Sequence, residues 1–149
     1  DGLGDDAGDA ALAAGGLVTG VIPESIAEKV GHHDLAEMHV VGSMHERKKL
    51  MFELADAFVA LPGGLGTLDE IFEVLTWAQL GYHAKPYGLL NTCGYFDSLL
   101  GFLDHAVTQR FMKPEHRAML VVETAPAALL NGLRHRRVPQ LDKWLDRNA

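Results

Sequence analysis

Short apolar runs and amphipathic segments alternate along the chain. Five runs have the length and the β-branched or aromatic content of buried strands: 17–22, 38–41, 57–61, 86–91 and 119–122. Apolar residues at helical spacing between these runs predict helices over 10–14, 24–30, 44–55, 68–80, 96–107 and 126–133. The alternation predicts an α/β fold with a doubly wound, mostly parallel sheet, because helices then cover both of its faces.

Residues that commonly cap helices stand at several of the predicted helix ends. Gly15 and Gly16 are expected to close the first helix, because glycine tolerates the left-handed backbone found there. Thr124 is expected to cap the last helix, with Pro126 in its first turn. The acidic, glycine-rich residues 1–9 are expected to form a flexible start.

The stretch PGGLGTLDE, residues 62–70, joins a predicted strand to a predicted helix. In such a unit glycines let the backbone approach a ligand and adopt positive φ, and the first helical amides point outward at the positive end of the helix dipole. This predicts an anion site, most often for a phosphate. The spacing matches neither the dinucleotide pattern G-x-G-x-x-G nor a loop ending in G-K-[ST]. The alternative is a structural turn, with Thr67 as N-cap and Glu70 closing a capping box.

A second segment, SMHERKKLM at 43–51, adds a basic pair. Ser43 and Glu46 fit a capping box, and a stripe of apolar residues on the helix is interrupted by Arg47. A cation on an inward-facing side is costly unless an anion meets it. The alternative, that Arg47 and Lys48 reach out to solvent, is the usual fate of such a pair. Both segments follow predicted strands, so we expect them to line one cleft.

Composition narrows the class of protein. The 149 residues suffice for a single domain over 1–149, and a net charge of −7 opposes binding to a nucleic-acid backbone. One cysteine, Cys93, and no apolar run of membrane-spanning length predict a cytoplasmic protein without a membrane segment. No metal is expected, because the adjacent His32, His33 and Asp34 are typical of a solvated loop. The chain begins with Asp1 and not Met, which suggests an absent upstream portion.

Together, residues 43–51 and 62–70 resemble the paired signature of the LONELY GUY family, the cytokinin riboside 5′-monophosphate phosphoribohydrolases. The similarity continues through DAALAAGG, GVIPE, TWAQLG, KPYGLLN and GYFDSLL and covers most of the chain. The resemblance implies a Rossmann-like fold, a homodimer, and an enzyme without a cofactor. The implied reaction is hydrolysis of the N-glycosidic bond of N6-substituted adenosine 5′-monophosphates to free base and ribose 5-phosphate.

The resemblance also implies roles for residues. Arg47 matches the catalytic arginine, and Glu70 matches the glutamate that ends the motif PGGxGTxxE. We expect Glu70 to stabilise the ribosyl cation and position water, as carboxylates do in glycoside hydrolysis. Substrate contacts are expected at Lys48, Gly63, Gly64, Leu65, Gly66, Thr67, Leu68, Asp69, Thr76 and Glu28.

The chain departs from the family pattern at its start. The family usually begins with a further strand–helix–strand unit, which this sequence is expected to lack, and Asp5 and Asp6 stand where the family has a glycine run. Two other functions are considered. One is a carrier that binds a nucleotide or a molybdenum cofactor without chemistry. The other is a decarboxylase, for which Lys48, Lys49 and Lys85 lack the surroundings of a pyridoxal phosphate site.

Overall fold

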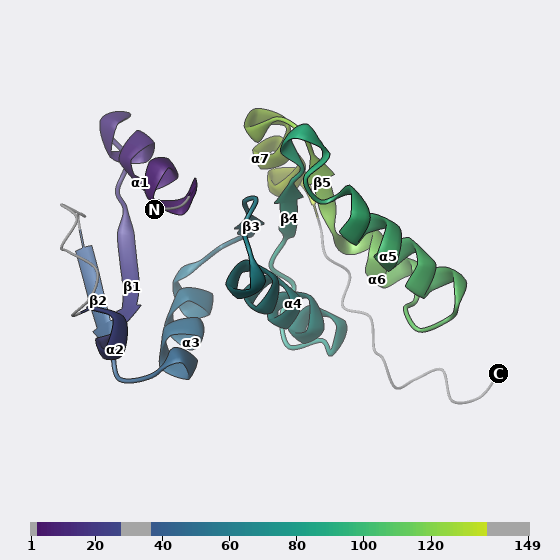
Figure 1. Cartoon of the computed structure of the whole chain (residues 1–149), viewed down its shortest axis with the longest axis horizontal. Helices are drawn as coiled ribbons and strands as arrows, with labels where there is room; N and C mark the ends of the chain where they lie inside the picture. Colours follow the sequence, from purple (N-terminus) through teal and green to yellow (C-terminus); the bar gives the residue numbers. More distant parts are fainter. Residues whose placement is uncertain (1–2, 28–36, 137–149) are drawn as a thin grey trace. The chain divides into compact units, whose positions relative to one another are not determined.

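The computed structural model of the protein describes residues 3–27 and 37–136 (Figure 1). The chain divides into two compact units, Asp1–Ala55 and Asp56–Ala149. Whether they act as the single domain expected from the sequence stays a prediction. None of the helices in the two described ranges is long and apolar enough to cross a membrane.

The first unit contains two paired strands with a helix after each. Its elements are α1 (Leu3–Ala13), β1 (Thr19–Pro23), α2 (Glu24–Ala27), β2 (Glu37–Val41) and α3 (Met44–Leu54). The strands are parallel, with Thr19 opposite Glu37 and Pro23 opposite Val41. Because parallel strands end at the same edge, α2 and α3 both start from the carboxyl edge of this small sheet.

The second unit is built on three parallel strands in the order β3-β4-β5. Its elements are β3 (Phe58–Ala60), α4 (Leu65–Gln79), β4 (Tyr87–Leu90), the 3₁₀ turn η1 (Thr92–Gly94), α5 (Asp97–Thr108), α6 (Pro114–Met119), β5 (Val121–Glu123) and α7 (Pro126–His135). Every strand pair in the described residues is parallel. The predicted α/β fold with parallel strands is therefore confirmed.

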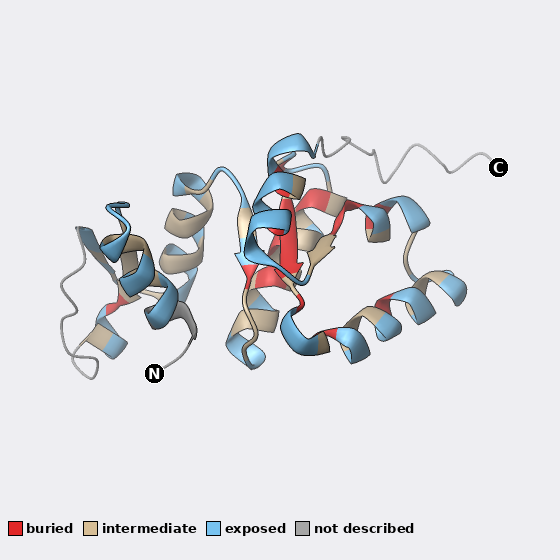
Figure 2. Cartoon of the chain, turned by 90° about the horizontal axis from the view of Figure 1, so that it is seen from above, coloured by how far each residue is buried: buried red, intermediate tan, exposed pale blue. Residues whose placement is uncertain are grey.

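Helices cover both faces of the second sheet. Tyr87 and Leu89 of the central strand belong to one buried cluster with apolar residues of α4 and α5. Gly88 faces the other way, because a Cβ there would lie 2.8 Å from the Cδ1 atom of Leu129 in α7. Figure 2 shows the buried residues gathered on this sheet and on the helix sides turned towards it. Complete burial of a side chain such as Leu89 contributes about 1.5–3 kcal/mol.

His83 anchors the segment between α4 and β4. The Nε2 atom of its buried ring lies 2.9 Å from the carbonyl oxygen of Val74. The Nδ1 atom accepts a hydrogen bond from the Lys85 amide at 3.1 Å. An accepting Nδ1 places the proton of the neutral ring on Nε2, which then donates to Val74. Burial lowers the pKa of His83 below 6.5, and the nearby Lys85 charge acts in the same direction.

Several predicted element ends were wrong. α1 begins at Leu3, inside the stretch that was expected to be flexible. The expected closure of this helix by Gly15 and Gly16 is confirmed, because Gly15 has φ 80° and the Gly16 amide donates to the Ala11 carbonyl. Ala125 and not Thr124 precedes α7 as its N-cap. The sequence did not predict α6, because that helix has only six residues and starts at a proline.

Candidate functional site

The helix after the glycine stretch begins earlier than the sequence predicted. Gly64 is the N-cap of α4, no side chain caps this end, and the first helical hydrogen bond runs from the Leu68 amide to the Gly64 carbonyl at 3.1 Å. The amides of Leu65, Gly66 and Thr67 therefore precede the first α-helical bond and carry the positive end of the dipole. This is the geometry in which helix starts bind anions.

The early start excludes the structural alternative for Glu70. Thr67 is the third residue of α4 and not its N-cap, so Glu70 lies in the second turn and cannot close a capping box. Glu70 is half-buried and lies four residues after Gly66. Residues at this spacing share a helix face, which puts the carboxylate one turn below the open amides. A carboxylate in this position is suited to chemistry next to a bound phosphate ester.

The prediction that glycines of this loop adopt positive φ was wrong. The positive-φ glycines of the described residues are Gly15, Gly81 and Gly94. Gly63 is required for space, because a Cβ there would collide with the Thr67 hydroxyl. Gly64 and Gly66 have no atom within 4 Å of an added Cβ. Packing inside the unit requires neither of these two glycines, but Gly64 is the N-cap of α4, a position that favours glycine. The open space beside Gly66 would let a ligand approach the backbone.

The turn after β4 holds the glycine loop, which the sequence did not predict. The Tyr95 hydroxyl donates to the Gly63 carbonyl at 2.9 Å. The buried Asn91 accepts from the Phe96 amide at 2.7 Å and donates to Asp97 at 2.8 Å, which fixes the turn that carries Tyr95. The only available signal was that both loops follow neighbouring parallel strands, and strand order cannot be read from one sequence.

The remaining contacts expected on α4 lie in different surroundings. Leu68 packs against the core cluster and Asp69 is exposed. Thr76 is exposed in the fourth turn of the helix, and its hydroxyl donates to the Phe72 carbonyl at 2.7 Å. Thr76 therefore lies well beyond the first turn, where the open amides are.

In the first unit the basic pair stands at the start of α3. Ser43 is the N-cap and accepts from the Glu46 amide at 3.2 Å, whereas the Glu46 carboxylate accepts from Gly42 at 2.8 Å, one residue earlier than in a standard capping box. Arg47 is half-buried, and its Nε donates to the Val21 carbonyl at 3.1 Å. Arg47 is thus fixed to β1 instead of reaching freely into solvent. Its neighbour Lys48 is also half-buried.

Some predicted features lie elsewhere or outside the described residues. The apolar stripe of α3 is partly exposed: its members Met44 and Leu54 are 43% and 55% exposed. Glu28 and the cluster of His32, His33 and Asp34 lie outside the described residues. In the part of the chain that is described, no group of three or more His, Cys, Asp or Glu side chains could hold a metal ion.

Comparison with known proteins identifies the family of the chain. Residues 5–133 match the family described as possible lysine decarboxylase. The chain belongs to this family. Its curated relatives include a cytokinin riboside 5′-monophosphate phosphoribohydrolase of Rhodococcoides fascians, 53% identical over 116 residues, which are 76% of this chain and 59% of the relative. A probable enzyme of the same name, LOGL9 of Oryza sativa subsp. japonica, is 52% identical over 128 residues, 85% of this chain and 56% of that protein.

The curated relatives carry phosphoribohydrolase names, and the resemblance to the LONELY GUY proteins is confirmed. The relative from Arabidopsis thaliana, LOG1, is 44% identical over 133 residues, 85% of this chain and 62% of LOG1. The chain spans about half to three fifths of the length of these curated relatives.

Proposed function

We propose that the protein hydrolyses the N-glycosidic bond of N6-substituted adenosine 5′-monophosphates, the class of nucleotide to which cytokinin riboside monophosphates belong, and releases the base and ribose 5-phosphate. The names of the curated relatives support this reaction. The observation that carries it is local: α4 opens at Leu65 with amides suited to a phosphate, and Glu70 lies one turn further on the side of Gly66. We also propose that the protein works as a cytoplasmic homodimer.

The chemistry requires a negative and a positive group. Breaking the bond between ribose and purine develops positive charge on the sugar and negative charge on the departing base. Glu70 stabilises the sugar cation and positions the attacking water, and Arg47 orients the nucleotide and offsets negative charge. The amides of Leu65, Gly66 and Thr67 bind the 5′-phosphate, with Lys48 as a further cation. The other proposed contacts are Gly63, Gly64, Leu68, Asp69, Thr76 and Glu28.

The test is release of free base from isopentenyl-AMP, followed by chromatography, in the chain and in Glu70→Gln. We expect Glu70→Gln to lower turnover by about 10²–10⁴ and to leave the melting temperature nearly unchanged, because glutamine keeps the size and shape of the side chain. Glu73→Gln is the matched control, since Glu73 is a glutamate one turn further along α4. It should retain turnover.

Two outcomes contradict the proposal. Equal losses in Glu70→Gln and Glu73→Gln would show a general effect of charge on α4. A chain that AMP stabilises against heat, yet that releases no base from either nucleotide, would be a binding protein of the carrier class. Coupling between Arg47→Ala and Glu70→Gln in a double-mutant cycle then tests whether both side chains serve one reaction.

A further inference from the structure

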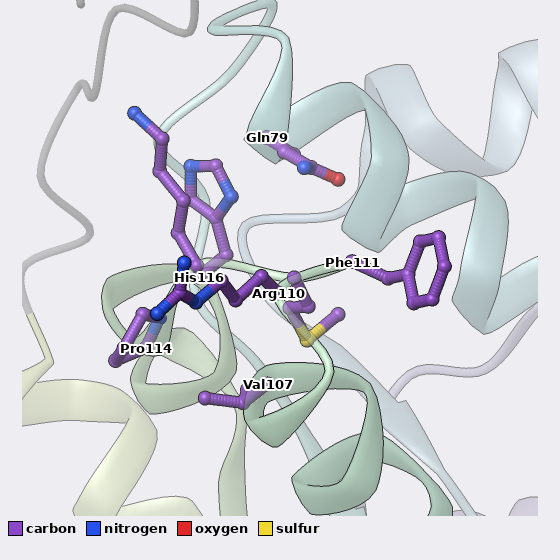
Figure 3. A pocket seen from close by; sticks show the side chains of 8 residues that line it. Gln79, Val107, Arg110, Phe111, Pro114 and His116 are labelled. Carbon is purple, nitrogen blue, oxygen red and sulfur yellow. The ribbon is translucent and has the colours of Figure 1, made fainter.

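A cavity of about 460 Å³ lies at the far end of α4 from the glycine loop (Figure 3). It is formed where α4 and α5 end and α6 starts. Gln79 is the last residue of α4, so the 15-residue helix, roughly 22 Å long, separates the cavity from the open amides. The lining residues are Gln79, Val107, Arg110, Phe111, Met112, Lys113, Pro114 and His116.

The lining combines positive charge with apolar surface. Arg110, Lys113 and His116 supply basic groups, and none of the described residues that line this cavity is acidic. This is unusual surface for a chain of net charge −7. Apolar side chains supply most of the rest, with Phe111 standing apart from Arg110 in Figure 3. The volume lies within the range of about 300–1,000 Å³ that is typical of small-molecule sites.

Arg110 has a backbone conformation that an arginine seldom adopts. Its φ is 64°, in the left-handed region, and the only other non-glycine residue of the described chain with positive φ is Cys93. The Arg110 amide bonds to the Val107 carbonyl at 2.9 Å and the Phe111 amide to the Ala106 carbonyl at 2.8 Å. These two bonds form a Schellman motif, whose left-handed position usually holds glycine.

Neither the Arg110 nor the Phe111 side chain is used by the fold. Within residues 3–27 and 37–136, the Arg110 guanidinium makes no ion pair or hydrogen bond. In a Schellman motif the residue in the position of Phe111 commonly packs back onto the helix, but Phe111 is 88% exposed. Strained backbone that gives no internal contact tends to occur at functional sites.

We propose that this cavity binds a small amphiphilic anion, in which a carboxylate, sulfonate or phosphate is attached to an aromatic body. Arg110 presents a planar guanidinium, which pairs with such oxyanions through two parallel hydrogen bonds, and Lys113 adds a second charge. Phe111 and Met112 cover the apolar body. The site is separate from the glycine loop and does not depend on the proposed hydrolysis.

The probe is 8-anilinonaphthalene-1-sulfonate, an aromatic sulfonate whose fluorescence rises in apolar surroundings. Its uncharged counterpart, N-phenyl-1-naphthylamine, has the same rings without the sulfonate. We expect one saturable sulfonate site per chain, at least roughly tenfold weaker binding in Arg110→Gly, and little binding of the uncharged dye. A tenfold change corresponds to about 1.4 kcal/mol. Arg110→Gly should not unfold the protein, because glycine adopts this φ freely.

Two sets of controls separate the cavity from general attraction to positive charge and from the glycine loop. Arg134→Gln removes an exposed arginine on α7 and should leave dye affinity unchanged. Glu70→Gln and added AMP should also leave it unchanged, whether or not the chain hydrolyses nucleotides. Arg110→Lys, which retains the charge, should bind more tightly than Arg110→Gly.

Four results would overturn the proposal. They are the absence of a saturable site, equal binding of both dyes, unchanged sulfonate affinity in Arg110→Gly, and displacement of the dye by AMP. The remaining possible occupant of this surface is a second copy of the chain, which sedimentation velocity would detect as a dimer. A dimer that dissociates in Phe111→Ser and leaves no dye site would make this surface a contact between two copies of the chain, and that too would refute a ligand site.

Discussion

The ends of α4 and α5 have the same backbone hydrogen bonds but different residues. At the end of α4 the Gly81 amide bonds to Ala78 at 3.0 Å and the Tyr82 amide to Trp77 at 2.9 Å, and α5 ends in the same two-bond motif. The left-handed residue is glycine in α4, with φ 79°, and Arg110 in α5, with φ 64°. Each is followed by an aromatic residue that is more than 70% exposed.

The two helix ends show that the motif does not by itself require glycine. Hydrogen bonds to the last carbonyls fix the turn, and the residue in the left-handed position only changes its cost. Gly81 has no atom within 4 Å of an added Cβ, so packing does not separate the two positions. What separates them is the side chain, because Arg110 lines a cavity. This difference supports a role for the guanidinium outside the fold.

The largest effect should come from replacing Gly81 by arginine, so that both helix ends carry an arginine in the left-handed position. Gly81→Arg places an L-residue at φ 79° in open space, and we expect the free energy of unfolding to fall by about 1–2 kcal/mol. Urea denaturation followed by circular dichroism measures this, with Gly101→Ala as a control at an open site within α5. No loss in Gly81→Arg would mean that left-handed arginine costs little here, and strain at Arg110 would then be no sign of function.

The start of α4 provides a second contrast, because a tyrosine holds it and no side chain caps it. Tyr95→Phe removes the hydrogen bond to the Gly63 carbonyl, worth about 0.5–1.5 kcal/mol. We expect AMP affinity to fall roughly two- to tenfold and exchange of the Leu68 amide, which bonds to the Gly64 carbonyl, to speed up. Tyr82→Phe, at the other end of the helix, should change neither. Unchanged exchange in Tyr95→Phe would show that the loop is held in another way.

The carboxyl edge of the second sheet was largely predictable from the sequence, and the opposite end was not. Glycines at 63, 64 and 66 after an apolar run indicate a strand, a turn and a helix start, since few other roles suit that pattern. The hydrogen bond from Tyr95 to the glycine loop could not be predicted, because it depends on the order of the strands. The Schellman motif at Arg110 could not be predicted either, because the glycine that usually indicates it is absent from the sequence. Composition around 107–116 gives no periodic signal, so both α6 and the cavity went unpredicted.

A smaller effect is expected from the opposite change, in which both helix ends carry a glycine in the left-handed position. Arg110→Gly relieves the left-handed strain, but glycine also gives the unfolded chain more freedom, which offsets part of the gain. We therefore expect the free energy of unfolding to rise by only about 0.5 kcal/mol. Thermal and urea unfolding measure it. A clear loss of stability would instead show that the Arg110 side chain is needed by the fold itself.

The smallest effect is a pH dependence confined to α4. His83, bonded to the Val74 carbonyl, holds the last turns of this helix, and burial holds its pKa below 6.5. The unfolded chain then binds a proton at higher pH than the folded chain. The stability from neutral His83 is fully present above pH 6.5 and is lost as pH falls below 6.5 and through the folded-state pKa.

His83→Gln should therefore flatten the fall in stability on acidification, because glutamine does not titrate. The measurement is urea unfolding between about pH 5 and 7.5, and the difference in slope between the chain and the variant removes the contribution of the other histidines. Amide exchange should locate the change at residues 74–85 and leave 104–112 unaltered, since His83 bonds to Val74 and Lys85, which both lie outside α5. Parallel slopes for the two proteins would mean that His83 accepts a proton without loss of its bond to Val74.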